Sequence, residues 1–182
     1  MEVSPESAPS AASASPAVAP ISVRWIETRD AEAVREIYNR EVEHSTVTFD
    51  MVPRTLDEQV AWIDDHTGSY PALVAVAATD QIVGFAALSP YRPRPAYSTT
   101  VENSVYVHRD ARGQGVGRIL MQALVETAAD HGYHSIIARI VGNHDTSIAL
   151  HQAVGFEIIG REHEIGRKFG RWLDVVIMQR ML

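Results

Sequence analysis

The chain has 182 residues, contains no cysteine and carries a formal net charge of −7. This length suffices for one domain with a substantial core and is short for two. An acidic surplus disfavours binding to nucleic-acid phosphates or to an anionic membrane surface, because both attract basic proteins. The lack of cysteine excludes disulfides, thiolate metal sites and a cysteine nucleophile. We therefore expect a cytoplasmic protein that acts on small molecules and has no nucleic-acid or membrane partner.

The N-terminal segment differs in composition from the rest. MEVSPESAPSAASASPAVAP is dominated by Ala, Ser and Pro and contains no basic residue. A secretory signal needs a basic start and an unbroken apolar run, and a transit peptide is rich in arginine, so neither label fits. Such a segment buries too little apolar surface to offset the entropy lost on ordering it. We expect a disordered tail over 1–21 and a single domain over 22–182.

Two amphipathic helices are predicted in the first third of the domain. Asp30 precedes a segment with apolar residues at helical spacing and is a candidate N-cap for the first helix. The expected core residues of this helix are Val34, Ile37, Tyr38 and Val42. After the irregular segment STVTFDMVPR, Thr55 and Glu58 form a capping-box pattern at the start of the second helix. The expected inward face of the second helix is Leu56, Val60 and Ile63.

Three strands are predicted next. ALVAVAA and IVGFAALS are rich in strand formers and are separated by a short turn, which predicts a hairpin. A proline-broken loop, PYRPRPAY, leads to the third strand, TTVENSVYV. Along this strand Glu102, Ser104 and Tyr106 alternate with Asn103 and the valines. The two sets of side chains therefore face opposite sides of the sheet.

The second half combines a crossover with a final hairpin. After the loop RGQGVGR at 112–118 we expect a helix from about Gly115 to His131, the buried strand SIIARIVG, and a helix DTSIALHQAV that ends at Gly155. The expected inward residues of the first of these helices are Val116, Ile119, Leu120, Ala123, Leu124 and Ala128. Two strand-like segments, around 157–165 and 172–179, close the chain. Few connections are parallel, so the pattern predicts a mixed α/β sandwich and not a doubly wound sheet.

The glycine loop suggests a phosphate site, and its spacing excludes two common kinds. A dinucleotide fingerprint requires G-x-G-x-x-G, but the third position is Arg118 counted from Gly113 or Leu120 counted from Gly115. A P-loop requires Gly-Lys-Ser/Thr, whereas the single lysine of the chain is Lys168. Any helix start still attracts anions, because the N–H groups of its first turn lack intrahelical partners. The alternative is a tight turn in which the glycines serve geometry alone.

Several motifs, in sequence order, resemble the GNAT superfamily of N-acetyltransferases. They are the strand VYV, then Arg112, Gly115 and Gly117 opening a helix, then Asn143 before a later helix that ends in GF. The resemblance covers roughly 23–182 and implies the GNAT fold, a splayed central α/β sheet flanked by helices. It also implies acetyl-CoA as co-substrate, with its pantetheine arm on the backbone of 105–107 and its pyrophosphate on 113–118. The implied cofactor-binding residues are Val105, Tyr106, Val107, Arg112, Gly113, Gln114, Gly115, Val116, Gly117, Arg118 and Asn143.

Three segments resemble more specifically the branch that acetylates phosphinothricin and methionine sulfoximine: SPYRPRPAY, TVENSVYV and GRKFGRWLD. This implies transfer of the acetyl group to the α-amino group of a small L-amino acid or analogue, by direct attack. Glu102 is in the branch's position for the general base that removes the ammonium proton. His151 stands where most of the superfamily has a tyrosine acid, and its role as acid, base or positioning group stays open. The alternatives are an exposed glutamate and a core histidine.

A free amino acid also presents a carboxylate, which a guanidinium recognises through two parallel hydrogen bonds. Arg92 and Arg94 lie in the loop before Glu102 and are the candidates for this role. At least one of the two is expected to be a solvated surface residue. Tyr97 and Phe49 are expected to line the same pocket.

The basic segment GRKFGRW contains Lys168, a further candidate substrate residue. In this branch the segment lies near a dimer contact and reaches toward a neighbouring active site, so we expect a homodimer with Phe169 and Trp172 at its contact. The seven histidines other than His151 show no metal-ligand spacing, and no metal is expected. Two alternatives stay open: acetylation of peptide or protein N-termini, and a non-catalytic sensor that binds acyl-CoA.

Overall fold

The computed structural model describes residues 20–142 and 144–182. Most of the tail expected over 1–21 lies outside these residues, as does Asn143. The helices are α1 (Ala31–His44), α2 (Leu56–Asp65), α3 (Val116–Asp130) and α4 (Asp145–Ala153). The strands are β1 (Ser22–Trp25), β2 (Ala72–Val76), β3 (Ile82–Pro90), β4 (Thr100–Val107), β5 (Ser135–Val141), β6 (Glu157–Lys168) and β7 (Arg171–Met181).

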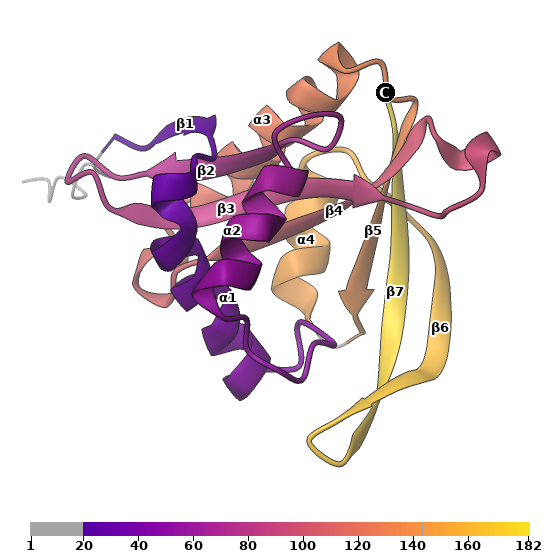
Figure 1. The fold of residues 1–182 in the computed structure, drawn as a ribbon. Helices are drawn as coiled ribbons and strands as arrows, with labels where there is room; N and C mark the ends of the chain where they lie inside the picture. Colours follow the sequence, from indigo (N-terminus) through magenta and orange to yellow (C-terminus); the bar gives the residue numbers. More distant parts are fainter. Residues whose placement is uncertain (1–19, 143) are drawn as a thin grey trace, which may run out of the picture.

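The strands form one mixed sheet in the order β1-β2-β3-β4-β5-β7-β6. Neighbouring strands are antiparallel except for β4 and β5, which are parallel. β4 and β5 pair through Thr100–Glu102 and Ser135–Ile137, and their pairing ends there. β5, β7 and β6 then run in a different direction from β1–β4 (Figure 1). The mixed sheet confirms the predicted α/β class, and its opening between β4 and β5 is the splay that the resemblance implied.

Helices cover both faces of the sheet. On one face, α1 and α2 pack over β2 and β3, where Val34, Ile37, Tyr38 and Val42 are buried as predicted. On the other face, the buried residues of α3, including Leu120 and Leu124, pack against β2, β3 and β4. Strands β2 and β3 are therefore covered on both sides, whereas β6 at one edge of the sheet is largely exposed (Figure 1).

Four local expectations differ from the structure. Leu56 and Ile119 were expected to face inward, yet they are 46% and 37% exposed. Both stand at the edge of an apolar stripe, where periodicity does not separate buried from exposed positions. Strand β1 was not predicted, because its four residues are too few to show an alternating pattern.

The fourth difference concerns Asp30, whose side chain does not cap α1. Its carboxylate accepts two hydrogen bonds of 2.7 Å from Arg24 and one of 2.9 Å from the N–H of Glu27. Burial opposes the ionisation of Asp30, but these hydrogen bonds hold its pKa below the ordinary value. The predicted capping box of α2 is present, with Thr55 and Glu58 bonded to each other's backbone N–H.

Candidate functional site

A cavity of about 570 Å³ lies in the opening between β4 and β5. Its walls come from the second half of β4, the glycine loop with the start of α3, the second half of β5, α4, and the segment 47–49. Most of the site residues expected from the sequence border this cavity. They are Phe49, Glu102, Val105, Tyr106, Val107, Arg112, Gly113, Gly115, Val116, Gly117, Arg118 and His151.

The backbone of β4 directs hydrogen-bonding groups toward the cavity. Residues of an antiparallel strand alternate between those that bond to a given neighbour and those that bond away from it. The N–H of His108 donates to the carbonyl of Val83 (2.9 Å), and Val107 stands opposite Gly84. Val107, and Val105 two residues earlier, therefore direct their N–H and C=O groups toward β5, beyond the point where β4 and β5 pair. An extended ligand with amide groups can bind here as a strand would.

The glycine loop forms an open cradle at the start of α3. Gly113 and Gly115 have φ angles of +75° and +82°, which side-chain-bearing residues adopt only with strain, and the space where a Cβ would stand is empty at both. Gly115 is the N-cap of α3, so the free N–H groups of the first turn face the cavity end. This geometry fits a pyrophosphate. Gln114 does not border the cavity, and its side chain donates to the carbonyl of Asp110 (2.8 Å).

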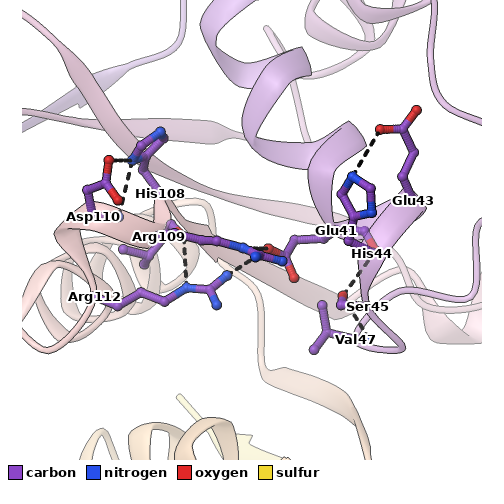
Figure 2. A network of polar contacts seen from close by, with 10 residues as sticks. Glu41, Glu43, His44, Ser45, Val47, His108, Arg109, Asp110 and Arg112 are labelled. Atoms are coloured by element: carbon purple, nitrogen blue, oxygen red, sulfur yellow. Dashed lines mark hydrogen bonds and ion pairs between the residues drawn. The ribbon is translucent and has the colours of Figure 1, made fainter.

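Arg112 is tied to helix α1 by a buried carboxylate. Its Nη2 donates to Oε1 of Glu41 at 2.8 Å and its Nε donates to the carbonyl of Val107 at 3.2 Å. Arg109 approaches the same carboxylate oxygen at 3.7 Å (Figure 2). Burial opposes the ionisation of Glu41, but a hydrogen bond from Ser45 and the two arginines keep its pKa below the ordinary value. Glu41 therefore holds the glycine loop against α1 and orients Arg112 beside the cavity.

Glu102 is half-buried on β4 at the last residue that pairs with β5. Burial raises the pKa of its carboxyl group; the charge of Glu162 adds to this, and the charges of Arg139 and Arg92 oppose it. Arg139 lies two residues beyond the β5 partner of Glu102, on the same face, and its Nη2 contacts Oε2 of Glu162 at 2.6 Å. A carboxylate whose pKa is raised toward neutrality is a stronger base than an ordinary one.

His151 is buried on α4 and directly contacts β4. Its Nδ1 lies 2.8 Å from the carbonyl of Ser147, and its Nε2 lies 3.0 Å from Nδ2 of Asn103. The ring also packs edge-on against Phe156, with centroids 5.1 Å apart. Burial lowers the pKa of His151. The structure thus joins the two expected catalytic residues to one cavity, with Asn103 beside both.

The loop between β3 and β4 holds Arg92, Arg94 and Tyr97, which are exposed and do not border the cavity. The guanidinium of Arg92 lies 5.0 Å from the ring centre of Tyr91. The charge of Arg92 lowers the pKa of Glu102, as a smaller influence than that of Arg139.

Lys168 is not a solvated residue of a turn, although it belongs to a basic segment. It is 2% exposed, and its ammonium donates to the carbonyl of Thr48 at 2.8 Å. Close by, the ring of Phe49 packs on Gly166 so tightly that a Cβ at Gly166 would lie 2.6 Å from a ring carbon. The hairpin of β6 and β7 therefore anchors the segment that forms one cavity wall, and Lys168 acts behind that wall.

The cavity residues that were not singled out from the sequence include Glu41, Asn103 and Arg139. A charged residue within an otherwise apolar strand was an available signal for Arg139 in SIIARIVG, whereas Asn103 has the polar neighbours Glu102 and Ser104 and gave no such signal. Glu41 gave no such signal, because its helix contains other glutamates. Within 20–142 and 144–182, no group of three or more potential metal-ligating acidic or histidine side chains is found. No helix of the described chain has the length and apolar character needed to cross a membrane.

Comparisons with known proteins agree with this geometry. A family model described as Acetyltransferase (GNAT) domain matches residues 23–177. The L-methionine sulfoximine/L-methionine sulfone acetyltransferase of Pseudomonas aeruginosa is 40% identical over 159 residues, covering 87% of this chain and 92% of that relative.

Two solved structures are similar across nearly the whole chain. A phosphinothricin acetyltransferase (Pat) from Sinorhizobium meliloti, solved in complex with AcCoA, has a TM-score of 0.86 at 37% identity, covering 89% of this chain and 88% of its own. A ribosomal-protein-alanine N-acetyltransferase from Brucella melitensis has a TM-score of 0.86 at 37% identity, covering 88% and 99%. With its splayed sheet, glycine cradle and buried carboxylate, this chain belongs to the GNAT acetyltransferases and is an enzyme that transfers acetyl groups.

Proposed function

We propose that this enzyme transfers the acetyl group of acetyl-CoA to the α-amino group of a small L-amino acid or analogue, such as methionine sulfoximine, methionine sulfone or phosphinothricin. One observation carries the proposal: the cavity between β4 and β5 has the glycine cradle at one end and the half-buried carboxylate of Glu102 in its wall. The activities named for the Pseudomonas and Sinorhizobium relatives support the substrate class.

The residues present fit acetyl-CoA. The cradle at Gly113–Arg118 would hold the pyrophosphate, since its glycines leave open space and the helix start supplies free N–H groups. The backbone groups of Val105 and Val107 that face the cavity would hold the pantetheine arm by strand-like hydrogen bonds. Bound there, the thioester supplies an activated acetyl group. A complex with AcCoA in the Sinorhizobium relative supports this assignment.

Glu102 is proposed as the general base. An α-amino group is largely protonated at neutral pH and cannot attack until it loses that proton. Glu102 would accept the proton directly or through a water molecule. Burial raises the pKa of Glu102, which makes its carboxylate a stronger base. The positive charges of Arg139 and Arg92 act in the opposite direction and favour the ionised carboxylate, which is the form that accepts a proton. Below its raised pKa the carboxyl is protonated, so activity should fall on the acid side.

The arginines near Glu102 are proposed to recognise the substrate carboxylate. Arg92 and Arg94 belong to the loop that leads into β4, the strand that carries Glu102, and this connection supports the proposal. Tyr97 in the same loop and Phe49 in the opposite wall would enclose the side chain of the amino acid. Lys168 supports this wall through Thr48 and is proposed to act on substrate binding indirectly.

A thiol-release assay tests the proposal. CoA release from acetyl-CoA would be followed with free L-amino acids, with the sulfoximine, sulfone and phosphinic analogues, and with the amides of the best substrates. We expect turnover of free acids and a marked loss on their amides. The variant Glu102→Gln should lose most of kcat at neutral pH, whereas Glu126→Gln, an exposed change on α3, should not.

The same assay separates two other functions. Equal rates on amides, or a preference for peptides with a free N-terminus, would favour N-terminal acetylation of peptides or proteins; the Brucella relative is named as a ribosomal-protein-alanine N-acetyltransferase. Binding of acetyl-CoA without CoA release in the presence of any amine tested would favour a sensor. Full activity of Glu102→Gln would refute the general-base assignment alone.

A homodimer is also proposed, formed through the hairpin of β6 and β7. This hairpin exposes several large apolar residues: Ile158, Ile159, Ile165, Phe169 and Trp172, each more than half exposed. Large apolar side chains thus face solvent along the length of the hairpin, and exposed apolar surface supports an interaction there. Light scattering during size-exclusion chromatography should give twice the chain mass, and Trp172→Arg should reduce it. A monomer at micromolar concentration would refute the proposal.

A further inference from the structure

The hydrogen bonds of His151 define which of its ring nitrogens carries a proton. Nδ1 lies 2.8 Å from the backbone carbonyl of Ser147, and a carbonyl oxygen only accepts. Nδ1 must therefore be the donor and hold a proton. In a neutral imidazole the other nitrogen, Nε2, then has only a lone pair.

The amide of Asn103 independently agrees with this tautomer. Its Nδ2 lies 3.0 Å from Nε2 of His151 and 3.5 Å from the sulfur of Met121, and a thioether sulfur is an acceptor. Both neighbours thus require the NH₂ end of the amide. If the amide were turned, its oxygen would face two acceptors. Asn103 therefore donates to Nε2, while its own Oδ1 is buried and has no partner among the described residues.

The surroundings favour the neutral ring. His151 is 2% exposed and Asn103 is 8% exposed, so neither is well hydrated. Phe156 covers one side of the ring, and no carboxylate is bonded to it among the described residues. Burial lowers the pKa of His151, and the nearby charge of a protonated His144 would lower it further.

We propose that His151 is a positioning residue and not the proton donor of the reaction: in the working enzyme it is neutral, bears its proton on Nδ1, and uses the Nε2 lone pair to hold the amide of Asn103 on β4. This inference rests on the proposed function and deepens it. The Nδ1 proton is committed to Ser147 and Nε2 has none to give. The departing thiolate then receives no proton from this ring.

A pair of variants separates positioning from proton transfer. Gln at position 151 places an amide oxygen near the former Nε2 and does not titrate, whereas Leu offers no acceptor. We expect His151→Gln to retain kcat within about tenfold of wild type and His151→Leu to fall well below it. A proton donor contributes roughly 10²–10⁴ in rate, so a loss of this size in both folded variants would overturn the proposal.

A second measurement needs no activity. In ¹⁵N-histidine-labelled enzyme at neutral pH, the resonances missing from His151→Gln identify His151. We expect a protonated Nδ1 and an unprotonated Nε2, and in Asn103→Leu the Nε2 shift should move toward that of a nitrogen without a hydrogen bond. A proton on Nε2, or a doubly protonated ring, would overturn the proposal. If no amine is acetylated, the proposed function fails, but this spectrum still decides the state of His151.

Discussion

Replacing Lys168 by methionine tests whether the hairpin of β6 and β7 holds segment 47–49, which forms one wall of the cavity, in place. Methionine retains a flexible apolar stem of similar length, so the packing beside Phe49 is largely preserved. What disappears is the ammonium that donates to the carbonyl of Thr48 at 2.8 Å. Thr48 is 7% exposed, so water does not readily replace the lost donor. The segment that carries Phe49 then loses its fixed position.

The size of the effect follows from the buried carbonyl. Leaving a buried acceptor unpaired costs about 1–3 kcal/mol. Part of this loss is offset, because burial lowers the pKa of Lys168, and methionine removes the cost of burying a charge. We expect a decrease of about 1–2 kcal/mol in the free energy of unfolding. If the displaced cavity wall stabilises the transition state less by a comparable free energy, kcat/KM for the amine falls roughly 5- to 30-fold.

Steady-state kinetics and urea unfolding would measure both effects, with Arg171→Met as the matched control. Arg171 is an exposed cation on the same hairpin, opposite Lys168. In Lys168→Met the KM for the amine should rise, while the KM for acetyl-CoA should stay within about twofold of wild type, because the glycine cradle lies elsewhere. Unchanged amine kinetics, or an equal loss in Arg171→Met, would refute the anchoring role.

Glu41→Gln should reduce the free energy of unfolding by about 1–2 kcal/mol at neutral pH, since the arginines it pairs with are partly exposed and screened. Folding lowers the pKa of Glu41, so its contribution to the free energy of unfolding is fully present above the ordinary pKa of 4.5 and is lost as the pH falls through the lower pKa of the folded state. The free energies of unfolding of wild type and Glu41→Gln should therefore converge at acid pH. Gly115→Ala places a side chain at a φ angle of +82°, which should lower the free energy of unfolding by about 1–2 kcal/mol and raise the KM for acetyl-CoA. Gly68→Ala is the control, because a Cβ at Gly68 meets open space and should change neither quantity. The pH profile of kcat/KM should have an acid limb set by Glu102, above the pKa of an ordinary glutamate, and a limb below that value would contradict its role.

Much of the fold was readable from the sequence because its signals are local. Helical spacing of apolar residues identified α1, the capping box placed the start of α2, and the glycines of RGQGVGR placed the start of α3. Each depends on residues within about two turns of one another. The order of these elements, together with the motifs in VYV and the glycine loop, also indicated the family and the cofactor. Edges of apolar stripes were assigned wrongly, because Leu56 and Ile119 differ from buried residues only in what lies opposite them.

The contacts that make the site were decided by tertiary structure. Arg112 meets Glu41 across 71 residues of sequence, Lys168 meets Thr48 across 120, and His151 meets Asn103 across 48. Periodicity and spacing carry no information on which distant side chains come within 3 Å. The sequence by itself therefore determined the local elements and the family, and it supplied the candidates for the phosphate-binding loop and for the base. Only the packing of α1, α4 and the final hairpin around the opening between β4 and β5 decided how these residues are held, since each depends on a partner brought near by folding.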